Sequence, residues 1–139
     1  MMIRVVFAAL SGGLTHFLLG WVTYGVLLAS FSLMNAGTAY GVAKKTEEME
    51  VAWVLAGSMA YALLLTLIFV HWARISTFKS GAIGGLWIGL LVSMEYHITN
   101  YGTSHLYNLN AAITYSFADA MASSITGGIV GWTLGFRQN

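Results

Sequence analysis

The sequence predicts an all-α membrane protein, a bundle of four transmembrane helices with both termini in the cytoplasm. Three observations predict this class. Of the 139 residues, 58% are hydrophobic and only 8% are charged, whereas soluble domains carry about 25% charged residues. The mean hydropathy is +0.73. The long apolar runs lack the apolar/polar alternation of a membrane β-strand, so the spans are expected to be helical.

The eleven charged residues divide the chain into four apolar runs, each long enough to supply the 20 or so residues that a spanning helix needs. The first is too long to cross once without tilting, bending or projecting, and Gly25 is a place where it can loosen. It also exceeds the apolar core of about 7–15 residues in a signal peptide, so we expect an uncleaved span. The four predicted spans cover residues 5–34, 51–73, 81–99 and 111–136.

The basic residues predict the orientation, because Lys and Arg are enriched in cytoplasmic connectors. One side of the membrane receives four of them and the other side only Lys44 and Lys45. The connector 35–50, which ends in an acidic run typical of a solvated helix start, is therefore expected outside, as is the connector 100–110. The prediction is a multi-pass protein of a bacterial inner membrane with the lipid bilayer as its partner. The four cytoplasmic bases are Arg4, Arg74, Lys79 and Arg137.

Two glycine ladders predict close helix packing, since small residues let helices approach in lipid. Each places a glycine at every fourth position, and both lie in the cytoplasmic halves of their spans. Packing of the third span against the fourth is one interpretation, and a homo-oligomer contact is the other. The ladders are Gly81, Gly85 and Gly89 in the third span, and Gly127, Gly131 and Gly135 in the fourth.

Two acids lie within predicted spans, where ionisable residues are costly and mark candidate functional sites. Glu95 lies about 22 Å along the third span and Asp119 about 25 Å from the cytoplasmic end of the fourth, at a rise of 1.5 Å per residue. Similar depth in the outer half predicts a pair that shares a proton or binds a cation. A structural role, with each acid satisfied by hydroxyl groups, is the alternative. Glu95 and His97 lie on nearly opposite sides of the helix and are not expected to hold one ion together.

Other polar residues extend this candidate site. On the fourth span, Tyr115, Ser116 and Ser123 share a helical face with Asp119, which predicts a water-filled path or hydrogen bonds to neighbouring helices. His16 lies in the middle of the first span and is expected to meet an acid across the bundle through an interhelical hydrogen bond, with metal binding as the alternative. No histidine pair has the spacing of a metal site, and no metal is predicted.

The chain also lacks the features of several other classes. With no cysteine it has no disulfide or thiolate site, and a net charge of +1 gives no basic face for nucleic acid. The nucleophile elbow, the zinc-protease helix, the Walker loop and the Rossmann glycine fingerprint are all missing from the sequence. We therefore predict a non-enzymatic protein without a cofactor.

The segment Gly-Trp-Val-Thr-Tyr-Gly-Val-Leu-Leu (residues 20–28) and the closing Gly-Gly-x-x-Gly-Trp-x-Leu-Gly (residues 127–135) carry a resemblance. With the acids Glu95 and Asp119, these motifs resemble small four-span membrane proteins of Bacteroidetes that are grouped as a domain of unknown function. The resemblance covers nearly the whole chain and implies a four-helix inner-membrane protein, without implying an activity. The first connector departs from the pattern, because relatives often have a more charged segment there.

Two functional hypotheses follow. The first is a non-enzymatic membrane subunit that acts by packing in a homo-oligomer or a larger membrane assembly. The second is a proton- or cation-coupled channel or carrier in which Glu95, Asp119 and His16 line the site. A water-accessible cavity at the acids favours the second hypothesis, and dry, fully hydrogen-bonded acids favour the first.

Overall fold

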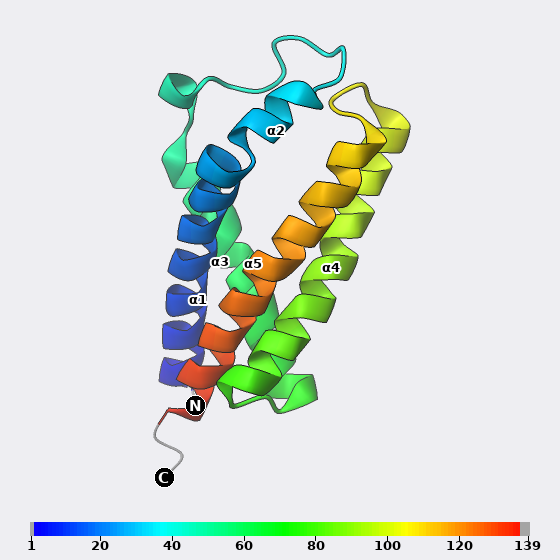
Figure 1. The fold of residues 1–139 in the computed structure, drawn as a ribbon. Coiled ribbons are helices and arrows are strands. Elements are labelled where there is room, and N and C mark those ends of the chain that lie inside the picture. Colours follow the sequence, from blue (N-terminus) through cyan, green and yellow to red (C-terminus); the bar gives the residue numbers. More distant parts are fainter. Residues whose placement is uncertain (1, 137–139) are drawn as a thin grey trace.

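The computed structural model describes residues 2–136, and these form helices joined by short connectors, with no β-strand among them (Figure 1). The all-helical prediction is confirmed. Arg137, one of the four bases used to predict the orientation, lies outside the described residues. The helical segments are α1 (Met2–Val22), η1 (Thr23–Leu27), α2 (Ala29–Met34), η2 (Thr46–Glu48), α3 (Val51–Ile68), η3 (Phe69–Ala73), α4 (Phe78–Thr103) and α5 (Leu109–Gly135).

Two helical segments, Met2–Leu27 and Val51–Ala73, are long and apolar enough to cross a membrane; in the described chain only these two pass on both length and composition. The helices α4 and α5 contain 26 and 27 residues, which at 1.5 Å per residue exceeds a hydrocarbon core of about 30 Å. They are therefore long enough to span, but they carry more polar residues.

The first predicted span is interrupted, as its length suggested. The α-helix changes at Thr23 into a π-helical segment, η1, which contains Gly25. Leu28 then leaves helical geometry, and α2 continues to Met34. The prediction that the segment loosens near Gly25 is confirmed.

The last two spans are longer than the apolar runs that predicted them, because their ends are set by capping residues. The Thr77 side chain accepts a hydrogen bond from the Ser80 N–H and caps α4. The Asn108 side chain does the same for the Ala111 N–H at the start of α5. A side chain that accepts from the first unpaired N–H groups of a helix stabilises the start of that helix. The helix therefore begins at the capping residue and not at the first residue of the apolar run.

The long helices form two pairs, α1 with α3 and α4 with α5, joined mainly where α1 packs on α5. In Figure 1 the pairs lie close together at the end where α1 begins and separate toward α2. The apolar core occupies the closed end, and its largest fully buried side chains are Phe69, Leu65 and Val130. The polar residues described below occupy the end where the pairs diverge.

The two glycine ladders face each other within this one chain. A Cβ added at Gly81 would collide with the Gly127 carbonyl oxygen, and one added at Gly85 would collide with the Ser123 carbonyl oxygen. Gly131 and Gly135 instead approach the backbone of the connector before α4, at Thr77 and Ser76. The ladders therefore serve packing within the chain.

The first and third connectors are joined across the open end of the bundle. Ala36 and Tyr107 form an isolated antiparallel bridge, and the Asn108 side chain donates to the Asn35 side-chain oxygen over 2.9 Å. Gly37 is needed here, because a Cβ would collide with the His105 carbonyl oxygen. The bridge fixes the position of Tyr107 above the bundle interior.

Candidate functional site at Asp119

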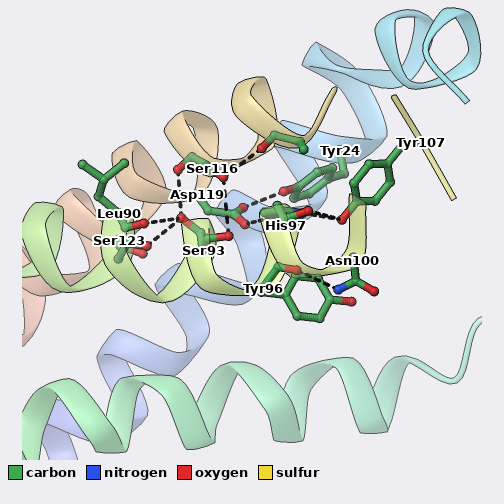
Figure 2. A network of polar contacts seen from close by, with 12 residues as sticks. Tyr24, Leu90, Ser93, Tyr96, His97, Asn100, Tyr107, Ser116, Asp119 and Ser123 are labelled. Atoms are coloured by element: carbon green, nitrogen blue, oxygen red, sulfur yellow. Dashed lines mark hydrogen bonds and ion pairs between the residues drawn. The ribbon is translucent and has the colours of Figure 1, made fainter. Parts of the chain in front are cut away.

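Asp119 is the centre of a polar network in the diverging half of the bundle (Figure 2). The Tyr24 hydroxyl donates to Asp119 Oδ1 over 2.7 Å. His97 Nε2 lies 2.9 Å from Asp119 Oδ2, and His97 Nδ1 lies 3.0 Å from the Tyr107 hydroxyl. Both carboxylate oxygens thus have a partner, and the partners come from η1 and α4.

The α4–α5 interface positions His97 against Asp119. Ser93, one turn before His97, donates to the Ser116 carbonyl oxygen over 2.9 Å, and Ser116 lies almost one turn before Asp119. This crossing contact fixes the register of the two helices. In this interface the His97 side chain is only 8% exposed, while the Asp119 side chain keeps 29% exposure.

Tyr24 reaches the acid from a segment of unusual geometry. It lies in η1, where the Leu28 N–H bonds to the Thr23 carbonyl five residues earlier, over 2.8 Å. Such π-helical turns are rare and occur frequently at functional sites. The altered geometry comes just where α1 diverges from α5, and Tyr24 bridges the two helices there.

His97 links the acid to the connector between α4 and α5. If Tyr107 donates to Nδ1, then Nε2 carries the proton and donates to Asp119; in the other tautomer the directions reverse. Burial, reinforced by neighbouring tyrosines and by Asp119, raises the pKa of Tyr107. Tyr107 therefore keeps its hydroxyl proton at neutral pH and can act as a donor.

Aromatic rings enclose this relay. The Tyr115 ring centroid lies 5.4 Å from those of His97 and Tyr107 and 5.5 Å from that of Tyr24. Its hydroxyl donates to Ser32 of α2 over 2.8 Å. Tyr115 was predicted as a site residue from its helical face. Its ring packs against three members of the network, and no hydrogen bond found in residues 2–136 joins it to the Asp119 carboxylate.

A cavity of about 180 Å³ lies beside Asp119. Since a water molecule needs roughly 10–15 Å³ of such space, the cavity has room for several. Two of its lining residues, Val92 and Tyr96, are exposed, so the cavity reaches the flank of the bundle. The lining residues are His16, Tyr61, Gly89, Val92, Ser93, Tyr96, Asp119 and Ser123.

His16 and Ser123, both predicted as site residues, line this cavity without bonding to the acid. His16 Nδ1 lies 3.3 Å from the Thr126 hydroxyl, and its ring packs against Tyr61 at 4.6 Å between centroids. The Tyr61 hydroxyl donates to Ser123 over 2.9 Å. His16 therefore makes an interhelical contact as expected, but its hydrogen-bond partner is a threonine on α5 and not an acid.

Glu95 does not belong to this site, and the prediction that it pairs with Asp119 is wrong. It is exposed on the outer face of α4, and none of the hydrogen bonds or ion pairs found in residues 2–136 involves it. The reason is helical geometry, because Glu95 is two residues from His97 and points away from the buried face. Glu95 lies on α4 as expected, but its side chain faces away from the bundle interior.

Ser116 has a packing role. It is buried, and its hydroxyl bonds to backbone oxygens of Ala112 and Ser93.

The residues missed by sequence reasoning are Tyr24, His97, Tyr107 and Tyr61. Extending the α4 glycine ladder by two more steps of four residues leads to Ser93 and His97, and this signal would have found the histidine.

The site contains one carboxylate and neighbouring imidazole groups, which suit a proton or a single cation. Among residues 2–136 there is no group of three or more His, Cys, Asp or Glu side chains placed to hold a metal ion. No family model, curated protein or solved structure matches the chain.

Proposed function

We propose that the chain is a four-span protein of a bacterial inner membrane, with the N-terminal end of α1 and the C-terminal end of α5 on the cytoplasmic side. The exposed apolar side chains of α4 and α5 support two spans beyond the two apolar ones, because a soluble bundle would cover such surfaces. Trp87, Leu91 and Met121 are each at least 60% exposed. The resemblance to four-span Bacteroidetes proteins agrees with this proposal.

The distribution of the described bases supports the proposed orientation. Arg4, Arg74 and Lys79 lie at the end where α1 begins, and Lys44 and Lys45 lie at the opposite end. A reporter fused after Phe136 tests it: cytoplasmic activity supports the proposal, whereas periplasmic activity contradicts it. The test rests on the excess of Lys and Arg in cytoplasmic segments.

Within this membrane protein, Asp119 is proposed to bind and release protons, with small cations as the alternative cargo. The contact between Asp119 and His97 carries this proposal, because an intramembrane acid bonded to an imidazole beside a cavity suits proton relays. When a proton passes from Asp119 to His97 Nε2, the Nδ1 proton passes to the Tyr107 oxygen while the Tyr107 hydroxyl gives its own proton to water, so Tyr107 stays neutral. The water is at the outer surface, where Tyr107 lines a cavity of about 590 Å³.

The test is proton flux into liposomes that contain the purified protein and a trapped pH-sensitive dye. The wild type is expected to acidify the interior faster than empty liposomes under an imposed gradient, and Asp119→Asn is expected to return the rate to that of empty liposomes. Glu95→Gln is the matched control, since it removes the other acid of α4 and α5 and should leave the rate unchanged. Replacing the proton gradient with sodium or potassium tests the cation alternative.

Wild-type liposomes that match empty ones for all three ions would contradict the transport proposal. A flux that persists in Asp119→Asn would contradict the role of Asp119. A flux lost equally in both variants would point to a general effect of removing charge.

A second candidate function is a subunit of a membrane assembly, and the position of Glu95 favours it. A carboxylate on the lipid-facing surface of α4 is costly unless a partner covers it or it reaches the interface. If a partner covers it, the detergent-extracted wild type should exceed the mass of one chain and Glu95→Gln should shift toward that mass. A wild type of single-chain mass would contradict self-association.

A further inference from the structure

The cavity beside Asp119 opens sideways, between α3 and α4. Helix α4 packs on α5, and α3 packs on α1 and more lightly on α5, so α3 and α4 are not a packed pair. At the closed end of the bundle the seam between them is filled, because a Cβ added at Gly84 would lie 3.1 Å from the Phe69 ring. Toward the other end of α3, a Cβ added at Gly57 meets no atom within 4 Å. The seam is therefore closed near Phe69 and open beside the cavity.

In the membrane placement proposed above, this opening faces lipid. Val92 and Tyr96 of α4 line the cavity and are exposed. Val92 lies about 21 Å along α4 from its first residue, Phe78, at 1.5 Å per residue, and a hydrocarbon core is about 30 Å thick. A ligand that enters from this side comes from the membrane, so it carries an apolar part.

The cavity carries one negative group and no strong base. Asp119 is the one acid among the described residues that line it, and none of those residues is Lys or Arg. The Asp119 side chain keeps 29% exposure even with its bonds to Tyr24 and His97. Since each carboxylate oxygen can accept more than one contact, the carboxylate can also receive a cationic group from the cavity side.

Aromatic rings form the walls around this carboxylate. From α1 and α3, the His16 and Tyr61 rings pack together with centroids 4.6 Å apart. From α4, the Tyr96 ring lies 5.0 Å from the His97 ring. The face of a tyrosine ring attracts organic cations, and quaternary ammonium groups are recognised in this way. An organic ammonium group therefore fits the combination of one carboxylate and several rings.

We propose that this cavity binds the charged head of a lipophilic organic cation, an ammonium group attached to an apolar body, that enters from the membrane between α3 and α4. The Asp119 carboxylate is the counter-ion, Tyr61 and Tyr96 face the charge, and the apolar body stays in lipid. This names a substrate class for the Asp119 site, so the inference rests on the membrane placement and on the role of Asp119 proposed above.

The organic cation and a proton compete for the same carboxylate. When the cation binds to protonated Asp119, the proton leaves along the relay through His97 and Tyr107, so one positive charge enters the site as another leaves it. Binding is therefore expected to weaken as the pH is lowered. The other titratable groups that face Asp119 or the cavity are Tyr24 from η1, His16 from α1, Tyr61 from α3, Tyr96 from α4 and Tyr115 from α5.

The test measures equilibrium binding of radiolabelled decyltrimethylammonium to the protein in phosphatidylcholine nanodiscs, with empty nanodiscs as the blank. The wild type is expected to bind the probe saturably. Asp119→Asn should weaken binding about tenfold or more, because it removes the counter-ion. Glu95→Gln is the matched control, since it removes an exposed acid of α4, and it should leave binding within about twofold of the wild type. Equal losses in the two variants, or wild-type binding no greater than the blank, would overturn the site.

Tyr96 offers a pair of variants that leave the bonds of Asp119 intact. Tyr96→Leu removes the ring and is expected to weaken binding about threefold, whereas Tyr96→Phe keeps the ring and should bind like the wild type. Tyr96 is 58% exposed, and no hydrogen bond found in residues 2–136 involves its hydroxyl, so both variants should fold. Equal binding by the two variants would overturn the contribution of this ring.

Competing ions define the class of ligand. Tetramethylammonium has the same charge without the alkyl tail, and it should compete at least about tenfold more weakly because each buried CH₂ adds affinity for the membrane. Equal competition by tetramethylammonium would overturn entry from lipid. Displacement of the probe by sodium or potassium at the same concentration would overturn the organic class and assign the site to small cations.

Two further outcomes separate this inference from the proton-transport proposal. Saturable binding that depends on Asp119, without proton flux in liposomes, would support this site and contradict transport. Proton flux that depends on Asp119, without binding of the probe, would contradict this site and leave the transport proposal in place. Wild-type binding that does not weaken at lower pH would overturn the competition between the cation and the proton.

Discussion

The α4–α5 pair and the α1–α3 pair are both antiparallel in the bundle, but their helices approach each other in different ways. In α4–α5 the ladders bring backbone against backbone, and neither helix is interrupted over 26 and 27 residues. In α1–α3 a Cβ added at Gly13 would collide with the Met59 side chain. Both of these helices change to π-helical geometry, α1 at Thr23 and α3 at Phe69.

The polar site lies at the seam between the two pairs. Asp119 and His97 belong to the uninterrupted pair, whose register is fixed by backbone contact, whereas Tyr24, His16 and Tyr61 belong to the interrupted pair. The pair with the smallest residues therefore positions the acid and the imidazole. The other pair supplies the Tyr24 and Tyr61 phenols and the second imidazole. Each prediction below disturbs one side of this comparison.

The largest effect is expected from Gly85→Leu. A Cβ at this position already collides with the Ser123 carbonyl oxygen, so a leucine forces α4 and α5 apart. Overpacking commonly costs about 1–3 kcal/mol, and a collision with backbone is expected to reach about 3 kcal/mol or more. Thermal unfolding in detergent, followed by circular dichroism, measures the change.

Gly57→Leu is the control for that substitution. Gly57 lies on α3, where an added Cβ meets no atom within 4 Å, so the same change of residue should move the unfolding temperature little. If the two variants lost similar stability, the claim that α4–α5 depends on close backbone contact would be contradicted.

A smaller effect is expected from Asp119→Ala, which removes the shared partner of Tyr24 and His97. Leaving a buried donor or acceptor unsatisfied costs about 1–3 kcal/mol, and the partial exposure of Asp119 places the expected loss near the lower half, about 1–2 kcal/mol. Glu95→Ala should cost nothing or stabilise, since no described contact is lost. Chemical unfolding of the two variants in the same detergent measures the difference in the free energy of unfolding. Equal losses of stability would contradict the claim that Asp119 lies in the bundle interior and Glu95 does not.

These two acids also show how far the sequence leads. Composition and span lengths predict an all-helical chain, and the four-residue spacing of the glycines predicts close packing, because both depend on local patterns. Depth along a helix placed Glu95 and Asp119 together, yet depth carries no information about which face a residue occupies. The four-residue spacing does indicate the face. Steps of four residues from Gly89 lead to Ser93 and His97, and Glu95 does not lie on that face.

Tyr24 and Tyr107 were beyond this kind of reasoning for a different reason. Tyr24 reaches Asp119 through a π-helical turn, and the α-helical periodicity used to read faces does not describe that turn. Tyr107 is held by a bridge to Ala36, a contact between connectors about 70 residues apart. Non-local pairings of this kind have no signature in the spacing of a single segment.

The smallest effect, and the most specific test of the seam, is expected from Tyr24→Phe. The variant keeps the ring that packs on Tyr115 at 5.5 Å and removes only the hydroxyl that donates to Asp119, so it should cost about 1 kcal/mol. Tyr40→Phe is the control, because Tyr40 is 92% exposed and should be neutral by the same unfolding measurement. If Asp119 acts in proton transfer, Tyr24→Phe should change the proton flux while Tyr40→Phe does not. A loss of stability without any change in flux would leave Tyr24 as a structural bridge between the two helix pairs, because its hydroxyl would then tie α1 to α5 without influencing how Asp119 exchanges its proton.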